Sequence, residues 1–82
     1  KMYPLMPLKS VELYRAMAQK EKVSVIARGR GGFLEAYEKY GKDLPEVWMK
    51  KRHAFIARTL GAYRKNPTAR RRLALIMWAF QP

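Results

Sequence analysis

Residues 43–82 read DLPEVWMKKRHAFIARTLGAYRKNPTARRRLALIMWAFQP. This stretch decides the fold, because it predicts a long helix, a proline-marked break and a shorter helix. From residue 47 to the end it carries nine Lys and Arg and no Asp or Glu. Charge of one sign at this density is typical of a surface that an anionic partner neutralises.

The long helix has a clear start and a clear end. Asp43 is the expected cap, Pro45 suits the first turn because it lacks an N–H, and Glu46 can complete a capping box. Asn66 and Pro67 end the pattern, so the helix is expected to run to about Lys65. At 100° per residue its apolar arc contains Trp48, Met49, Phe55, Ile56, Leu60 and Tyr63.

The other side of this helix is basic. Small residues separate the cations, so a phosphate strand or another helix can approach the backbone closely. The cations are Lys50, Lys51, Arg58, Arg64 and Lys65, and the small residues are Ala54, Ala57 and Gly61.

Arg52 breaks the pattern because it falls within the apolar arc. We expect it to pair with an acidic residue such as Glu35 or Glu38. The alternatives are that its stem packs while its head reaches the edge, or that it faces a substrate.

The last helix is expected to begin after Thr68 or Asn66 as its cap and to continue to about Phe80. After Arg72 it is apolar almost all round, which predicts the central helix of a bundle or, alternatively, a contact with a partner. Its first turn carries three consecutive cations that span 200°, so at least two should face solvent or a ligand: Arg70, Arg71 and Arg72.

The first half of the chain predicts an arm and two shorter helices. Pro4 and Pro7 favour an extended apolar arm over residues 1–9, which packs on its own domain or on a neighbouring subunit. Ser10 is the expected cap of a helix that runs to about Lys22, with a break near Val23. Residues 23–27 fit either a short extended piece or a continuation of that helix. A further helix is expected over residues 33–40, ended by Gly41.

A glycine-rich turn, Arg28-Gly29-Arg30-Gly31-Gly32, precedes that helix. Exposed amides at a helix start can hold a phosphate, so Arg28, Arg30, Gly31 and Gly32 are candidate anion-binding residues. The turn lacks the spacing of a P-loop or of a dinucleotide fingerprint. The alternative is a plain turn with solvated arginines.

Together these patterns predict an all-α fold: a small bundle of four helical elements in one basic domain, residues 10–82, with the arm at residues 1–9. The 82 residues contain no cysteine, so neither a disulfide nor a thiolate metal site is expected. The longest apolar run, residues 73–80, is too short to span a bilayer, and no signal-peptide pattern is visible. We expect an intracellular location, or one inside a virion or other nucleoprotein particle.

Enzyme function is not expected. His53 is the only histidine and Asp43 the only aspartate, so the chain has no catalytic constellation and no set of metal ligands. No cofactor is predicted.

The net charge of +12 therefore favours a nucleic-acid-binding module that contacts mainly phosphates. DNA and RNA stay open, and few Asn or Gln side chains are placed to read bases. The candidate nucleic-acid-binding residues are Arg28, Arg30, Gly31, Gly32, Lys50, Lys51, Arg58, Arg64, Lys65, Arg70, Arg71 and Arg72.

The sequence also fits two alternative functions. A small structural protein of a virion or ribonucleoprotein particle would contact neighbouring subunits through residues 1–9 and the last helix. A cationic, bacteriocin-like peptide would bind a membrane surface, although the wide apolar arcs are needed for packing between helices.

Overall fold

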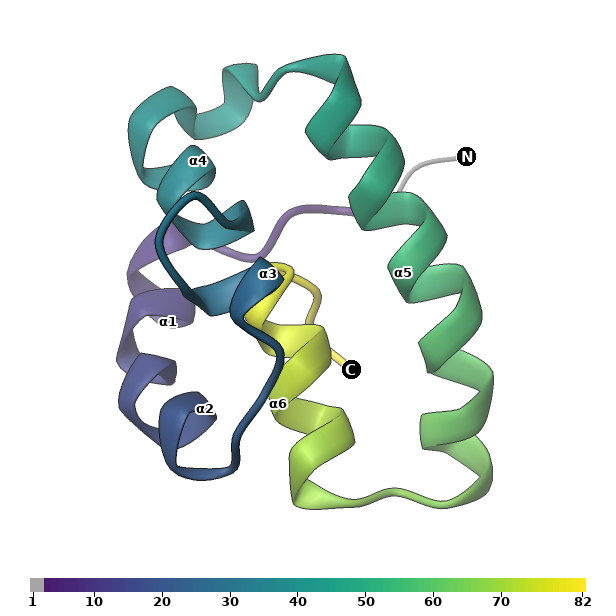
Figure 1. Cartoon of the computed structure of the whole chain (residues 1–82). Coiled ribbons are helices and arrows are strands. Elements are labelled where there is room, and N and C mark those ends of the chain that lie inside the picture. The colour runs from purple at the N-terminus through teal and green to yellow at the C-terminus, as the bar shows by residue number, and fades with distance from the viewer. Residues whose placement is uncertain (1–2) are drawn as a thin grey trace.

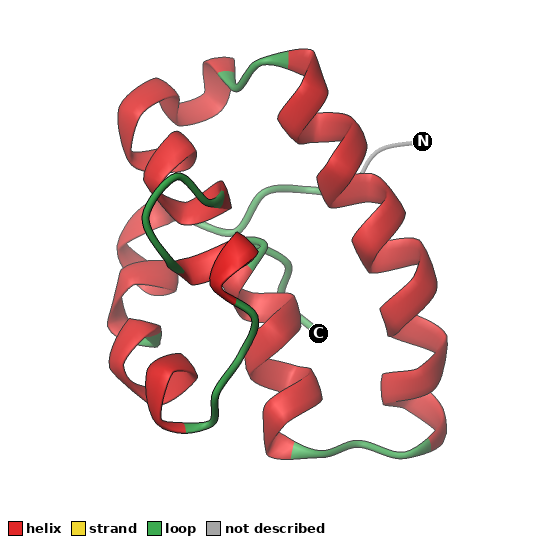
Figure 2. Cartoon of the chain, viewed as in Figure 1, coloured by secondary structure: helices red, strands yellow, loops and turns green. Residues whose placement is uncertain are grey.

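A computed structural model describes residues 3–82, and these form an all-α bundle without strands, as predicted (Figures 1 and 2). A 3₁₀ turn, η1, covers Gly41–Asp43. The α-helices are α1 (Leu8–Leu13), α2 (Arg15–Lys20), α3 (Val25–Arg28), α4 (Phe33–Tyr40), α5 (Glu46–Lys65) and α6 (Ala69–Met77).

Helix α6 lies at the centre of the bundle. It packs against α2, α3 and α5, and in Figure 1 it runs between α5 on one side and α1 and α2 on the other. Its residues Leu73 and Leu75 to Met77 are buried, and so are Trp78 and Ala79, which follow it. The prediction of a central last helix is therefore confirmed, although the helix ends at Met77 rather than near Phe80.

The predicted helix from Ser10 to Lys22 is wrong at its start and in its continuity. Helix α1 begins at Leu8 because Pro7 is the N-cap, and the Pro7 carbonyl accepts the N–H groups of Ser10 and Val11 at 3.0 and 3.2 Å. The Ser10 side chain makes no capping hydrogen bond. Tyr14, with φ −94° and ψ 0°, separates α1 from α2.

The predicted break near Val23 is confirmed. Lys22 has a positive φ of 58°, so the chain leaves the helical path there. The ambiguous stretch that follows contains α3, a four-residue helix. The Ser24 hydroxyl caps it by accepting the N–H of Ile26 at 3.4 Å.

Helix α5 starts without the predicted side-chain cap. Asp43 belongs to η1, and Pro45 is the N-cap residue, whose carbonyl accepts the N–H groups of Trp48 and Met49. The capping box is wrong for the same reason, since Glu46 is the first residue of the helix rather than the third.

The other predicted helix ends agree with the structure. Gly41 ends α4 with φ 60°, and α5 ends at Lys65. Thr68 caps α6 by accepting the N–H of Arg71 at 3.1 Å.

An aromatic cluster joins α4, α5 and α6. The Trp78 indole stacks on Phe33 at 5.0 Å and on Phe55 at 5.3 Å, measured between ring centroids. Trp48 lies 6.1 Å from Trp78. Pairs of this kind each add about 0.5–1.5 kcal/mol beyond the burial of their area, so the cluster fixes α5 against the centre of the bundle.

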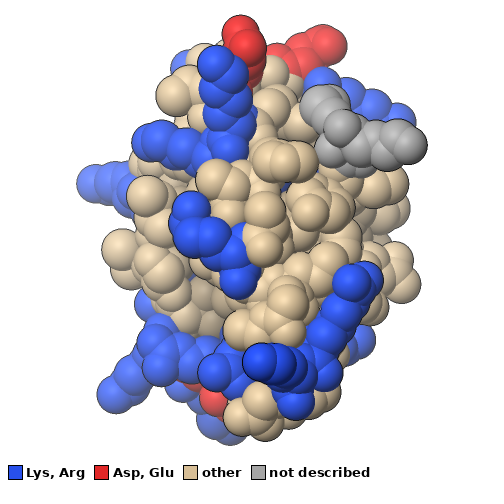
Figure 3. Space-filling model, turned by 90° about the vertical axis from the view of Figure 1, so that its right-hand side faces the viewer, with Lys and Arg blue, Asp and Glu red and all other residues tan. Residues whose placement is uncertain are grey.

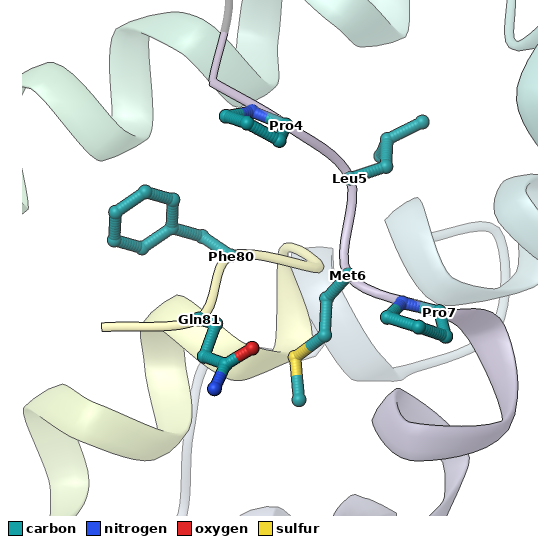
Figure 4. Close-up of a pocket in the computed structure, with 6 residues that line it drawn as sticks. All are labelled: Pro4, Leu5, Met6, Pro7, Phe80 and Gln81. Carbon is teal, nitrogen blue, oxygen red and sulfur yellow. The ribbon is translucent and has the colours of Figure 1, made fainter.

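Residues 3–7 form an N-terminal arm that packs on the chain's own helices. The predicted arm of residues 1–9 is too long, because Leu8 and Lys9 belong to α1. The Met6 N–H donates to the Ala79 carbonyl at 2.6 Å, and the Tyr37 hydroxyl donates to the Met6 carbonyl at 2.7 Å. Figure 4 shows the arm beside Phe80 and Gln81, where they line a pocket of about 400 Å³. Residues 1–2 lie outside the described range.

Arg52 holds the arm, the end of the chain and α5 together. The side chain is 1% exposed. Its guanidinium donates four hydrogen bonds of 2.6–2.9 Å, all to backbone carbonyls, those of Tyr3, Pro4, Trp78 and Ala79. The prediction of an acidic partner is wrong, because peptide dipoles instead of a carboxylate satisfy the buried charge. Burial lowers the pKa of Arg52, and the nearby Tyr37 opposes that change.

Candidate nucleic-acid interface

The exposed side of α5 carries all five of its predicted cations. Arg52, Ile56 and the aromatic residues turn inward, and this orientation leaves the opposite side of the helix to solvent. The small residues between the cations are exposed too, as the sequence predicts. We call this surface the α5 basic face: Lys50, Ala54, Ala57, Gly61, Arg64, Lys51, Arg58 and Lys65.

The cations of the α5 basic face form two rows along the helix. Lys51, Arg58 and Lys65 are seven residues apart, which is about 10.5 Å along the axis and returns to nearly the same direction. Lys50 and Arg64 belong to the second row. Ala54 and Gly61 lie in the lane between the rows, and a Cβ added at Gly61 would meet nothing within 4 Å. The lane therefore leaves the helix backbone open to close approach.

The cations of this face have few acidic neighbours. Lys50 Nζ lies 3.6 Å from the Glu46 carboxylate, but both side chains are largely exposed and such pairs contribute little. Lys51 Nζ sits over the Trp48 ring at 5.1 Å. Among the described residues, Arg58 and Arg64 have no carboxylate within 4 Å. Their charge is therefore available to an anionic ligand.

Most acidic residues belong to elements other than α5. Glu12 on α1 and Glu35 and Glu38 on α4 influence one another, while Glu46, the first residue of α5, lies beside Lys50. In Figure 3, which looks at the α5 side, Lys and Arg extend from top to bottom, while Asp and Glu occupy mainly the top edge. The α5 side therefore carries an excess of positive charge, and such an excess attracts anions.

The pKa of Glu38 is raised by its surroundings. A hydrogen bond with Glu12 raises the pKa of Glu38, burial raises it further, and Arg15, 3.8 Å away, lowers it. A carboxyl group whose pKa is raised in the folded state stabilises the fold while protonated, and that contribution is lost as the pH rises through its pKa.

We therefore expect Glu12→Gln to increase stability slightly at pH 7, by less than about 1 kcal/mol. This increase in stability should become smaller at low pH, where Glu38 is protonated. Urea unfolding at pH 7 and pH 4 measures both values. An equal change in stability at the two pH values would contradict the hydrogen bond between Glu38 and Glu12.

The three arginines at the start of α6 divide between two surfaces. Arg70 Nη2 donates to the Lys22 carbonyl at 3.2 Å, and Arg71 Nη1 donates to the Asn66 carbonyl at 2.8 Å. Arg70 and Arg71 line a cleft of about 490 Å³ between the end of α5 and the start of α6. Arg72 lines a different groove, beside α1. Arg70 and Arg71 thus lie beside the end of α5, on the side of Thr59 and Asn66, while Arg72 lies on a separate surface.

The glycine-rich turn does not offer the free amides that the sequence suggested. The Gly31 N–H donates to Glu35 Oε1 at 2.9 Å, and the Gly32 N–H donates to the Gly29 carbonyl at 3.0 Å. Arg28 Nε is also engaged, by the Val23 carbonyl at 2.6 Å. Arg30 is exposed.

Close packing explains two of these glycines. A Cβ on Gly32 would lie 2.5 Å from the Ile26 carbonyl oxygen, and a Cβ on Gly29 would lie 2.8 Å from that of Val25. The turn therefore needs glycine to fold back onto α3, which is a structural reason for the pattern.

One feature of the surface was not found from the sequence. A cleft of about 280 Å³ lies between α3 and α5, and two cations of the α5 basic face line it. Residues 51, 54, 55 and 58 lie along one edge of α5 and form one wall of the cleft. The other walls come from Ile26 and Trp78, which are far from this part of α5 in the sequence. The residues of the cleft are Ile26, Lys51, Ala54, Phe55, Arg58 and Trp78.

Within residues 3–82, no three His, Asp or Glu side chains lie together as metal ligands, and no helix has the length and hydropathy to cross a bilayer. Comparisons with protein-family models, curated proteins and solved structures found no match.

Proposed function

We propose that this chain is a non-enzymatic module that binds nucleic acid through phosphate contacts on the α5 basic face. Arg70 and Arg71, which lie beside the end of α5, would add further phosphate contacts. The observation that carries the proposal is the set of five exposed cations on one helix, in a part of the chain that has no acidic residue after Glu46.

The dimensions suit a polyanion. A helix of 20 residues is about 30 Å long, and each strand of a duplex presents one phosphate about every 3.4 Å along its axis. Two rows of cations along such a length can contact several phosphates at once. Each neutralised phosphate releases a counterion, so the affinity should fall steeply as salt is added.

Sequence preference should be weak. Helix α5 contains no Asn or Gln, the side chains that pair bidentately with adenine, and the lane between its cations presents Ala54 and Gly61. The surface therefore favours contact with the backbone over the reading of base edges.

The test compares two triple variants by fluorescence anisotropy with labelled nucleic acid across a range of salt concentrations. One variant replaces Lys51, Arg58 and Arg64 with Gln. The control replaces three exposed lysines of α1, α2 and α4 with Gln: Lys9, Lys20 and Lys39. Each variant lowers the net charge of +12 by three, so overall charge is matched.

We expect the α5 variant to bind duplex DNA more than tenfold more weakly at 100 mM salt. The slope of log affinity against log salt should become shallower by about 2.7, which is 0.9 for each lost contact. The control should keep most of the wild-type slope. Equal losses in both variants would show that net charge alone causes binding, and a flat salt response of the wild type would overturn the proposal.

The alternative function is a structural module of a larger assembly, and the surfaces predicted for its subunit contacts are partly occupied by the chain itself. The predicted subunit contacts were residues 1–9 and the last helix, but residues 3–7 and α6 pack on the chain itself. We therefore keep phosphate binding as the proposed function.

A further inference from the structure

The cleft between α3 and α5 combines an apolar interior with a charged edge. Phe55 and Trp78 contribute aromatic carbon, Ile26 closes the α3 side, and Lys51 and Arg58 lie on the α5 side. Its volume of about 280 Å³ exceeds the ~150 Å³ of an apolar cavity that accommodates benzene. The space is therefore large enough for a planar ring system.

The aromatic wall has a buried part and an unused donor. Trp78 is 3% exposed and stacks on both Phe33 and Phe55, so only a small part of the indole faces the cleft. Its Nε1 is buried and has no hydrogen-bond partner among the described residues. Phe55, which is only partly buried, is the aromatic surface that a ligand can reach.

The charged edge continues beyond the cleft. Lys51 and Arg58 flank Ala54 and Phe55, and Lys65 extends the same row by two more turns of the helix. A single anionic headgroup would use one or two of these cations. A chain of phosphates that passes the cleft would use the whole row, so the charge pattern favours a linear polyanion that carries apolar rings.

We propose that this cleft binds an unpaired nucleobase while the phosphates on either side of it contact Lys51 and Arg58. The inference rests on the proposed function and deepens it, because it selects single-stranded or locally unpaired nucleic acid over a fully paired duplex. Contact between a base and an aromatic side chain contributes about 1–3 kcal/mol, which corresponds to about a fivefold to 150-fold change in affinity.

The test fills the cleft without changing the charge. Ala54→Leu places a larger side chain in the cleft wall, and Ala57→Leu makes the same change at an exposed position of α5 that does not line it. Both positions are exposed and leucine is a good helix former, so both variants should fold, as circular dichroism would check. The probes are a single-stranded oligonucleotide, an abasic strand of equal length and a duplex.

We expect the wild type to bind the single strand at least fivefold more tightly than the abasic strand. Ala54→Leu should remove most of that difference, while Ala57→Leu, which lies on the same basic face but outside the cleft, should preserve it. The two variants should change duplex binding to a similar extent. Equal wild-type affinities for the single and abasic strands would overturn the inference but leave phosphate binding intact.

Failure to bind any of the three probes would overturn the proposed function itself. Vesicles with anionic lipid and an acidic peptide distinguish the other occupants. If Ala54→Leu weakens binding to either of them while oligonucleotide binding is unchanged, the cleft serves that ligand and the nucleobase inference is wrong.

Discussion

Arg52→Met should destabilise the protein by about 4 kcal/mol, a large part of the total stability of a small domain. The change removes four hydrogen bonds from a buried guanidinium. Buried carbonyls left without a donor each cost about 1–3 kcal/mol. Methionine retains most of the apolar stem, so the decrease in stability reflects the lost hydrogen bonds more than lost packing. Urea unfolding of both proteins gives the difference.

In the Arg52→Met variant, the N-terminal arm should lose more protection from hydrogen exchange than the rest of the chain. Tyr3 and Pro4 lose their link to α5, so the Met6 N–H, which donates to the Ala79 carbonyl, should exchange with solvent faster. Hydrogen exchange followed by NMR reports this amide directly. A destabilisation below about 1 kcal/mol with unchanged exchange would contradict the role assigned to Arg52.

Two controls separate this arrangement from an ion pair. Arg52→Lys keeps the positive charge but cannot span four carbonyls, so it should recover less than half of the lost stability. Glu35→Gln removes an acidic group that the sequence offered as a partner, and it should leave the Met6 exchange rate unchanged. Acceleration of that exchange by Glu35→Gln would support an ionic partner instead.

Gly32→Ala is the second substitution with a large expected effect, a destabilisation of about 3 kcal/mol. The added Cβ would lie 2.5 Å from the Ile26 carbonyl oxygen and 2.9 Å from that of Val25. Both atoms belong to the backbone of α3, so relief requires the turn to move away from the helix. Thermal unfolding should show a melting temperature lower by more than 10 °C, since 1 kcal/mol shifts a domain of this size by about 4–8 °C.

Two further glycines provide matched controls. At Gly61 the added methyl group meets open space on an exposed helix, so Gly61→Ala should stabilise the protein by about 0.5–1 kcal/mol. At Gly31 space is also open, but φ is 73°, so Gly31→Ala should cost only about 1–2 kcal/mol. A loss at Gly32 no greater than that at Gly31 would contradict the steric explanation.

The helix pattern of this chain could be predicted from sequence, because local residues determine it. Gly41, Asn66 and Thr68 mark element ends that the structure reproduces. The caps at Ser10 and Asp43 were mispredicted, because Pro7 and Pro45 start the helices with their own carbonyls. A capping side chain and an unused one look the same in sequence.

Long-range contacts could not be predicted in the same way. The position of Arg52 within the apolar arc is visible in the sequence, but its partners are carbonyl groups, which every residue carries. The glycine-rich turn gave a misleading signal, because glycines that permit close packing on α3 look the same as glycines that expose amides to a phosphate.

The candidate site could also be predicted only where it depends on local sequence. The periodicity of α5 was enough to place its cations on one exposed side, since a regular helix fixes those directions. The cleft was missed because Ile26 and Trp78 approach α5 only through the tertiary fold. The separation of Arg72 from Arg70 and Arg71 also depends on where α6 packs.

An NMR titration of the ¹⁵N-labelled chain with a short single-stranded oligonucleotide tests the central claim most directly, because it reports where the ligand binds. We expect the largest shifts at the exposed positions of α5 between Lys50 and Lys65, and at Arg70 and Arg71. Raising the salt concentration should reverse these shifts. Shifts centred on α1 and α2 with α5 unchanged, or no shifts at low salt, would contradict the central claim.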